Sequence, residues 1–141
     1  MSSIRGVLDT NVVLSARRSS NPESAPSQLL EHLRAGEWTL LYSSDILGEY
    51  VEKLLDHGAS GEQAVEFVAL LTTLGEEVAI EFFHLRHYPS DADDTAFLLC
   101  AWNGAASHLA SYDRHLLDLA PFYKSAVAIC RPREMLVAVL A

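Results

Sequence analysis

Residues 5–9 read Arg-Gly-Val-Leu-Asp, a short apolar run that ends on an acid. We expect a buried strand over residues 5–8, which stops where the polar residue begins. Similar short runs recur along the chain, and they predict further strands over 38–42, 78–83, 108–111 and 127–130. Short apolar strands that alternate with helices are typical of a parallel sheet covered on both faces.

Helical periodicity fills the intervals between these strands. The clearest case begins at Ser43-Ser44-Asp45, continues with apolar residues at 3.6-residue spacing, and ends at Gly58. Further helices are expected over 27–35, 61–74, from Asp91 to about Gly104, around 116–117, and over 132–140. The sequence thus predicts one three-layer α/β domain spanning residues 1–141, with a five-stranded parallel sheet and helices on both faces.

The composition excludes several classes of protein. The 141 residues carry 10 basic and 19 acidic side chains, a net charge of −9, which argues against a broad nucleic-acid-coating surface. No apolar run approaches the 18 residues of a membrane span, and no signal segment is evident. Cys100 and Cys130 lie in apolar segments, so we expect buried thiols and a reducing, cytoplasmic location.

Acidic side chains follow the expected strands. In an open parallel sheet, ligands bind beyond the carboxyl ends of the strands. Four segments bring acids to that edge, namely Asp9, Glu49, Asp94 and Asp113. Carboxylates gathered there repel one another unless cations lie among them. Oxygen ligands without His or Cys suit Mg²⁺ or Mn²⁺, ions that serve phosphoryl chemistry.

Each acid also has an ordinary structural interpretation. Glu49 can pair with Lys53 four residues later on the same helix. Asp91 can cap its helix while Asp94, three residues on, reaches back to it. The two remaining acids can cap the turns that follow their strands. Asp94 nevertheless heads the buried row of its helix, where an unpaired carboxylate is costly.

Four segments of the chain, in this order, resemble the PIN-domain family. They are Val-Leu-Asp-Thr-Asn-Val at 7–12, Ile-Leu-Gly-Glu-Tyr at 46–50, Asp-Ala-Asp-Asp-Thr-Ala-Phe-Leu at 91–98 and Ser-Tyr-Asp-Arg-His-Leu-Leu at 111–117. The closing Cys-Arg-Pro-Arg-Glu at 130–134 is similar to bacterial PIN proteins of the VapC toxin type. The resemblance covers essentially the whole chain and implies an Mg²⁺- or Mn²⁺-dependent ribonuclease.

The resemblance also implies roles for particular residues. The catalytic set would be Asp9, Glu49, Asp94 and Asp113, of which Asp9, Asp94 and Asp113 would bind the metal. Supporting residues would be Asn11, Asp91 and Ser111. The family often has Thr-Gly-Asp where this chain has Ser-Tyr-Asp, and Tyr112 offers a ring on which a base can stack. Candidates for RNA backbone contacts are Arg17, Arg18 and Arg114, which are otherwise ordinary surface arginines.

A toxin of this type implies an RNA substrate, a cognate antitoxin that covers the acidic pocket, and a homodimer. An alternative is a catalytically impaired PIN-fold module that binds RNA or protein. A third interpretation is a different magnesium phosphotransferase or phosphohydrolase. That class favours an Asp-x-Asp-x-Thr element after the first strand, whereas Asp9 is followed by Thr10-Asn11-Val12.

Overall fold

The computed structural model describes residues 4–141 and contains one five-stranded sheet of order β3–β2–β1–β4–β5. Every neighbouring pair of strands is parallel. The strands are β1 (Arg5–Leu8), β2 (Thr39–Tyr42), β3 (Glu76–Glu77), β4 (His108–Ala110) and β5 (Ala128–Cys130). The predicted α/β class with a parallel five-stranded sheet is therefore confirmed.

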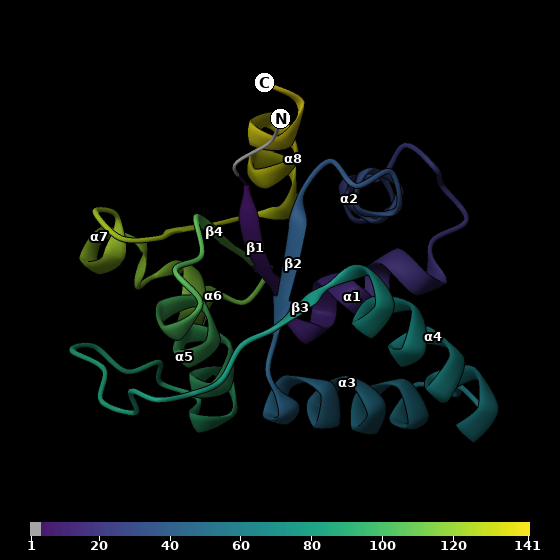
Figure 1. The fold of residues 1–141 in the computed structure, drawn as a ribbon, viewed down its shortest axis with the longest axis horizontal. Helices are drawn as coiled ribbons and strands as arrows, with labels where there is room; N and C mark the ends of the chain where they lie inside the picture. Colours follow the sequence, from purple (N-terminus) through teal and green to yellow (C-terminus); the bar gives the residue numbers. More distant parts are fainter. Residues whose placement is uncertain (1–3) are drawn as a thin grey trace.

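Helices fill the connections between the strands (Figure 1). They are α1 (Thr10–Arg18), α2 (Ala25–Arg34), α3 (Ser44–Asp56), α4 (Gly61–Leu74), α5 (Thr95–Asn103), α6 (Arg114–Leu117), α7 (Ala120–Tyr123) and α8 (Pro132–Leu140), with a 3₁₀ turn η1 (Ala92–Asp94) before α5. Strands β1 and β2 run toward the end of the molecule where α3 lies, and α3 packs against α1, α4 and α5 there.

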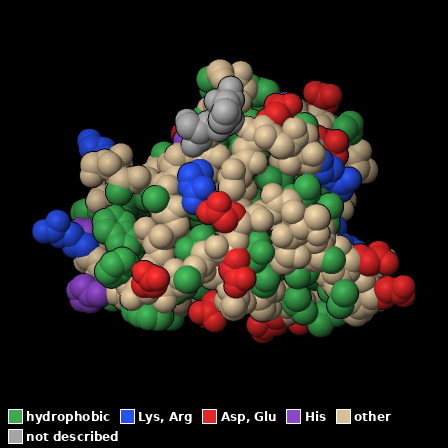
Figure 2. All heavy atoms as spheres, in the orientation of Figure 1, with side chains coloured by type: hydrophobic (Ala, Val, Ile, Leu, Met, Phe, Trp, Pro, Cys, Tyr) green, Lys and Arg blue, Asp and Glu red, His purple; other side chains and the backbone are tan. Residues whose placement is uncertain are grey.

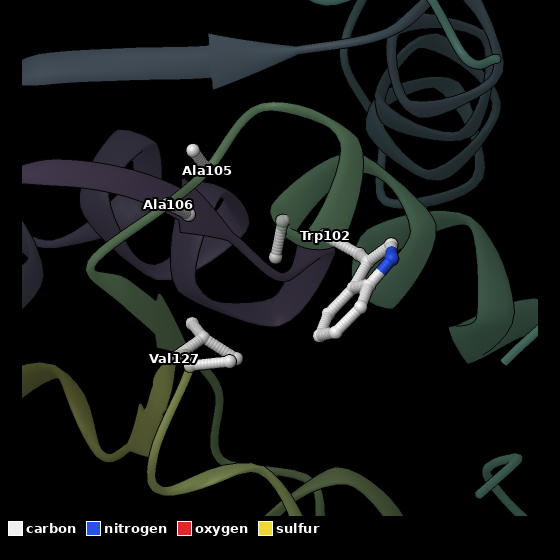
Figure 3. Close-up of a pocket in the computed structure, with 6 residues that line it drawn as sticks. Trp102, Ala105, Ala106 and Val127 are labelled. Atoms are coloured by element: carbon white, nitrogen blue, oxygen red, sulfur yellow. The ribbon is translucent and has the colours of Figure 1, made fainter. Parts of the chain in front are cut away.

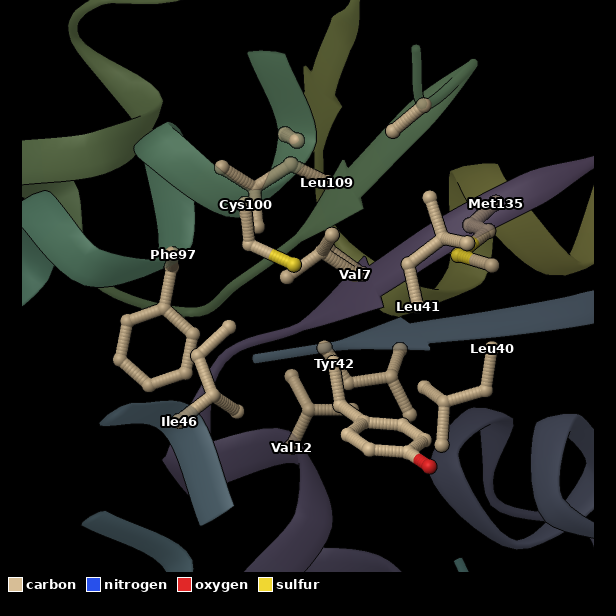
Figure 4. Packing of buried hydrophobic residues seen from close by; sticks show 14 of the residues in the cluster. Val7, Val12, Leu40, Leu41, Tyr42, Ile46, Phe97, Cys100, Leu109 and Met135 are labelled. Carbon is tan, nitrogen blue, oxygen red and sulfur yellow. The ribbon is translucent and has the colours of Figure 1, made fainter. Parts of the chain in front are cut away.

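Side chains of β1 show that the sheet is covered on both faces. Gly6 faces α8, because a methyl group at its Cα would collide with the Met135 side chain and lie 3.2 Å from the Trp38 ring. Successive residues of a strand point to opposite faces. Val7 accordingly lies on the other face, beside Cys100 of α5 (Figure 4). Helices α5 and α8 therefore form separate layers, with the sheet between them.

One predicted strand is wrong in position. The expected strand at 78–83 is replaced by the two-residue β3 at Glu76–Glu77, two residues earlier. Val78 still donates its N–H to the Tyr42 carbonyl at 2.7 Å. Beyond it, the Asn103 side chain accepts the N–H groups of residues 81 and 82 and donates to the carbonyl of residue 82. An amide on α5 thus satisfies backbone groups that a neighbouring strand would otherwise pair.

Helices α1 and α7 are not among the predicted elements. Helix α1 begins at Asp9, whose carboxylate accepts the Thr10 N–H, and it buries Val12 and Val13. Both valines are β-branched and favour strands when judged from local sequence. Helix α7 has only four residues. The thiols of Cys100 and Cys130 are free and buried, as predicted. Over residues 4–141, every helix falls short of the length and apolarity required to cross a bilayer.

Candidate metal-binding and active site

Three carboxylates meet at the carboxyl edge of the sheet. Asp9, Asp94 and Asp113 each offer an oxygen, and these oxygens lie within 4.8 Å of one another. Asp9 directly follows β1, Asp113 follows β4, and Asp94 ends the turn that leads into α5. Since β1 and β4 are adjacent, their ends deliver two of the acids side by side. We call Asp9, Asp94 and Asp113 the acidic triad.

Ser111 holds two members of the acidic triad in place. Its hydroxyl donates to Asp9 Oδ2 at 2.5 Å and accepts the Asp113 N–H at 2.8 Å. The other oxygen of Asp9 accepts the Thr10 N–H at 2.7 Å. Ser111 is fully buried, and its hydrogen bond to Asp9 ties the end of β4 to the end of β1. Ser111, one of the supporting residues that the resemblance implies, thus contacts Asp9 directly.

Asp94 is the member of the acidic triad whose side chain most needs a cation as a partner. Its side chain is 6% exposed, and Oδ2 is buried without a hydrogen-bond partner among the described residues. Burial, the neighbouring charges of Asp9, Asp113 and Asp91, and a side-chain hydrogen bond with Asp113 together raise the pKa of this carboxyl to about 7. An unpartnered buried carboxylate oxygen facing two more carboxylates is costly without a positive charge. The residues therefore fit a hard divalent cation such as Mg²⁺ or Mn²⁺.

Asp9 is also a buried carboxylate beside other carboxylates, but hydrogen bonds stabilise its charge. Burial raises the pKa of Asp9, the hydrogen bonds from Ser111 and Thr10 lower it, and the nearby charges of Asp113 and Asp91 raise it. Asp9 is 4% exposed and thus at least as enclosed as Asp94, which is 6% exposed. Two oxygens of Asp9 are already hydrogen-bonded, so its position is fixed independently of any ion.

Glu49 lies beside the acidic triad rather than within it. It is half-buried on α3, and partial burial raises its pKa. Lys53 opposes that rise, while the charges of Asp93 and Asp9 add to it. Glu49 is thus close enough for Asp9 to influence its protonation, although the three mutually close oxygens belong to the other acids.

The predicted cap at the start of the α5 segment holds in part. The carboxylate of Asp91 accepts the Asp93 N–H at 3.0 Å and caps η1. Asp94 does not reach back with its side chain; its backbone N–H donates to the Asp91 carbonyl at 3.1 Å. The side chain of Asp94 is thereby left for the acidic triad, whereas Asp91 is exposed at its edge.

The remaining predicted residues lie at varying depths. Asn11 is exposed, and among residues 4–141 the side-chain oxygens of Asp9 accept hydrogen bonds from Thr10 and Ser111 rather than from Asn11. Arg17 is half-buried and lines a hollow between α1 and α4, while Arg18 and Arg114 are exposed. Tyr112 is 41% exposed and stands between Ser111 and Asp113 in the chain.

Tyr50 is a supporting residue that sequence analysis misses. Its hydroxyl donates to the Leu8 carbonyl at 2.5 Å, directly before Asp9. The ring is fully buried and lies 6.3 Å from the Phe97 ring of α5. On the sequence it appears in the apolar stripe of α3 and in the segment at 46–50 that resembles the family, and neither indicates its hydrogen bond. The signal available is that a buried tyrosine hydroxyl requires a partner.

A second hollow lies at the opposite edge of the sheet. It has a volume of about 240 Å³ and sits before β4 and β5, where Trp102, Ala105, Ala106 and Val127 line it (Figure 3). Every side chain around it is apolar or an indole. It therefore lacks the acids and bases of a catalytic site. On the face shown in Figure 2, acidic side chains gather near the lower edge, where α3 lies in Figure 1.

Comparison with known proteins identifies the class. A family model described as a PIN domain matches residues 5–115, most of the chain, and the chain therefore belongs to the PIN-domain family. A solved chain of the same fold comes from the VapBC2 complex of Rickettsia felis, whose structure contains a DNA fragment from their promoter. The two are 15% identical with a TM-score of 0.58 over 89% of this chain and 97% of that chain. No curated protein sequence matches this chain.

Proposed function

We propose that this protein is an Mg²⁺- or Mn²⁺-dependent endoribonuclease and the toxin component of a type II toxin–antitoxin system. The observation that carries the proposal is the buried, unpartnered oxygen of Asp94 within a triad of carboxylates in a PIN domain. A purely structural triad would be expected to neutralise its charges with internal partners. The chain instead concentrates like charges where the fold binds ligands.

The residues divide the work between them. Asp9, Asp94 and Asp113 would hold the cation, which when bound supplies Lewis acidity to a phosphodiester and to water. Ser111 orients Asp9 by donating its hydroxyl to Oδ2, and it positions Asp113 by accepting the Asp113 N–H. Glu49, half-buried beside them with a raised pKa, is placed to accept a proton at its carboxylate.

We extend the proposal to partners. The substrate is RNA, and the cognate antitoxin covers the acidic triad with a basic side chain. The protein forms a homodimer, and the apolar helix α4, on which Val65 is 67% exposed, is the candidate surface for it. We place the protein in the cytoplasm as one nuclease domain over residues 1–141, in line with its two free thiols.

The test is RNA cleavage by purified full-length protein in EDTA, Mg²⁺ and Mn²⁺. Wild type should cleave only with metal, and Asp94→Asn should lose cleavage by at least 100-fold, a typical loss when one charge-stabilising group is removed. Asp118→Asn is the matched control, because Asp118 is an exposed acid after α6 that lies outside the acidic triad. It should cleave like wild type.

Three other outcomes would contradict the proposal. Full activity of Asp94→Asn, with contaminating nuclease excluded by the purified Asp9→Asn protein, would remove the acidic triad from the chemistry. Turnover of a small phosphomonoester without RNA cleavage would indicate a phosphohydrolase. Absence of both cleavage and metal binding would favour the non-catalytic binding module.

A further inference from the structure

A cleft of about 540 Å³ is lined by residues that follow β4 and β5, at the same carboxyl edge of the sheet as Asp9 and Asp113. One wall comes from the connection between α1 and α2, including Asn21 and Glu23. The other wall is formed by Tyr112, Arg131 and Arg133. The cleft therefore combines an exposed aromatic ring with two cationic side chains, and one acid opposes them.

The pairing of β4 with β5 explains why these three residues share a wall. Ala110 is in register with Cys130, and the next residue, Ser111, donates its N–H to the Cys130 carbonyl at 2.9 Å. Continuing this register places Arg131 opposite Ser111, and Tyr112 is the residue after Ser111, so Tyr112 and Arg131 both line the cleft where the two strands end. Ser111 points inward to Asp9, so the following side chain, Tyr112, turns outward.

The guanidinium groups of the two arginines are available to bind an anion. Neither Arg131 nor Arg133 forms a salt bridge with any of residues 4–141. Glu134 accepts the backbone N–H of Arg131 at 3.2 Å rather than its guanidinium. Burial raises the pKa of Tyr112, and the charges of Arg133 and Arg131 lower it, which places both cations near the ring.

We propose that this cleft binds the nucleotide next to the scissile phosphodiester of single-stranded RNA, with its base on Tyr112 and its phosphate between Arg131 and Arg133. Bases stack on aromatic rings, and guanidinium groups match phosphate oxygens. A base reaches a protein ring only when it is unstacked, which favours single strands. The inference rests on the proposed function. It places the bound nucleotide beside the proposed cleavage site because Tyr112 lies between Ser111 and Asp113 in the chain.

The test measures binding of a short, fluorescein-labelled, single-stranded RNA of random sequence by fluorescence anisotropy. The full chain carrying Asp94→Asn serves as parent, so that the RNA remains intact, which a denaturing gel verifies. Tyr112→Ala should raise Kd about 5- to 100-fold with an unchanged salt dependence, the loss expected for one stacked base. Tyr112→Phe, which keeps the ring, should bind like the parent.

The arginines are tested by the slope of log K against log salt concentration. The double variant Arg131→Gln/Arg133→Gln should flatten that slope by up to about 1.4, since each phosphate contact on a single strand contributes about 0.7. Arg34→Gln is the matched control. It ends α2 about 14 Å from the end that lines the cleft, by the helical rise, and should leave the slope unchanged.

Unchanged RNA affinity of Tyr112→Ala, or an unchanged salt slope in the double arginine variant, contradicts the proposal that the cleft binds a nucleotide. If wild type still cleaves RNA with metal, that result leaves the proposed function standing. Conversely, RNA binding that depends on the ring and both arginines supports the cleft even if no metal-dependent cleavage occurs. Binding of a polyglutamate peptide through the arginines, with no RNA binding, overturns the assignment to RNA.

Discussion

Replacing Asp94 by Asn should stabilise the metal-free protein at pH 8. The pKa of Asp94 in the folded chain is about 7, against an ordinary value of 3.8. One pKa unit corresponds to 1.36 kcal/mol, so the ionised carboxylate costs the fold at most about 4 kcal/mol. Solvent that reaches the triad screens the charges, and about half of that figure, near 2 kcal/mol, is the working expectation.

The direction of the pH dependence follows from proton binding. Between pH 3.8 and 7 the folded chain binds more protons at Asp94 than the unfolded chain, so stability falls as pH rises through this window. Above pH 7 the penalty is complete, and below 3.8 it vanishes. At pH 5 about a third of it is present by the same relation. The stabilising effect of Asp94→Asn should therefore shrink about threefold from pH 8 to pH 5.

Thermal unfolding in EDTA measures this effect. An unfolding entropy of about 2.1 cal/mol/K per residue makes 1 kcal/mol correspond to about 3.4 °C for a chain of this length. Asp94→Asn should raise Tm by about 7 °C at pH 8 and about 2 °C at pH 5, by the same conversion. Asp118→Asn should stay within about 1–2 °C of wild type, as surface substitutions usually do.

Magnesium supplies the second arm of the experiment. A ligand at one hundred times its Kd stabilises the folded state by about 2.7 kcal/mol. Wild type should gain that stability in Mg²⁺ at pH 8, and Asp94→Asn should gain much less. A fall in Tm for Asp94→Asn at pH 8, or equal shifts at both pH values, would refute the reasoning. The carboxylate would then be a structural partner and not a repelled charge.

Further substitutions test Ser111, which supports the triad, and the packing at Gly75 and Gly48. Ser111→Ala removes the donor to Asp9 and leaves the Asp113 N–H without its acceptor, so we expect a loss of about 1–3 kcal/mol and slower RNA cleavage, measured by urea unfolding and initial rates. Ser111→Thr, which keeps the hydroxyl, should retain cleavage. Gly75→Ala should cost about 1–3 kcal/mol, because a methyl group there meets two backbone carbonyls at 2.9 and 3.0 Å. Gly48→Ala, in open space on α3, should instead add about 0.5–1 kcal/mol, and the same sign for both variants would contradict this account.

Local sequence predicts the elements whose burial is local. Helix α3 shows its apolar stripe at every turn, and Ser43 accepts the Ile46 N–H as its cap, so both its existence and its start are readable. The strand predicted at 78–83 is wrong because the partners of this segment are distant in the sequence. Its backbone groups are satisfied by Asn103, more than 20 residues away, and no local pattern encodes that partner.

The positions of the acids can be predicted from the sequence for a topological reason, whereas the hydrogen bonds that hold them cannot. A parallel sheet places the residues after its strands at one edge, so Asp9 and Asp113 are found from strand ends alone. The hydrogen bond between Ser111 and Asp9 spans 102 residues and requires β1 to pair with β4. The local hydrophobic pattern does not reveal which strands are neighbours in the sheet. Glu49 stands on α3 rather than after a strand, and it lies near the triad but outside the cluster of mutually close oxygens.

Tyr112 shows how a departure from a family pattern can leave a site intact. A glycine is required where φ is positive or where a side chain would collide. Among the non-glycine residues from 4 to 141, positive φ occurs only at Ala105, so the backbone of Tyr112 is ordinary. Its side chain turns outward while Ser111 bonds to Asp9 on the inner side. The tyrosine therefore keeps the geometry of the triad and adds a ring at the cleft, where glycine would contribute no contact surface.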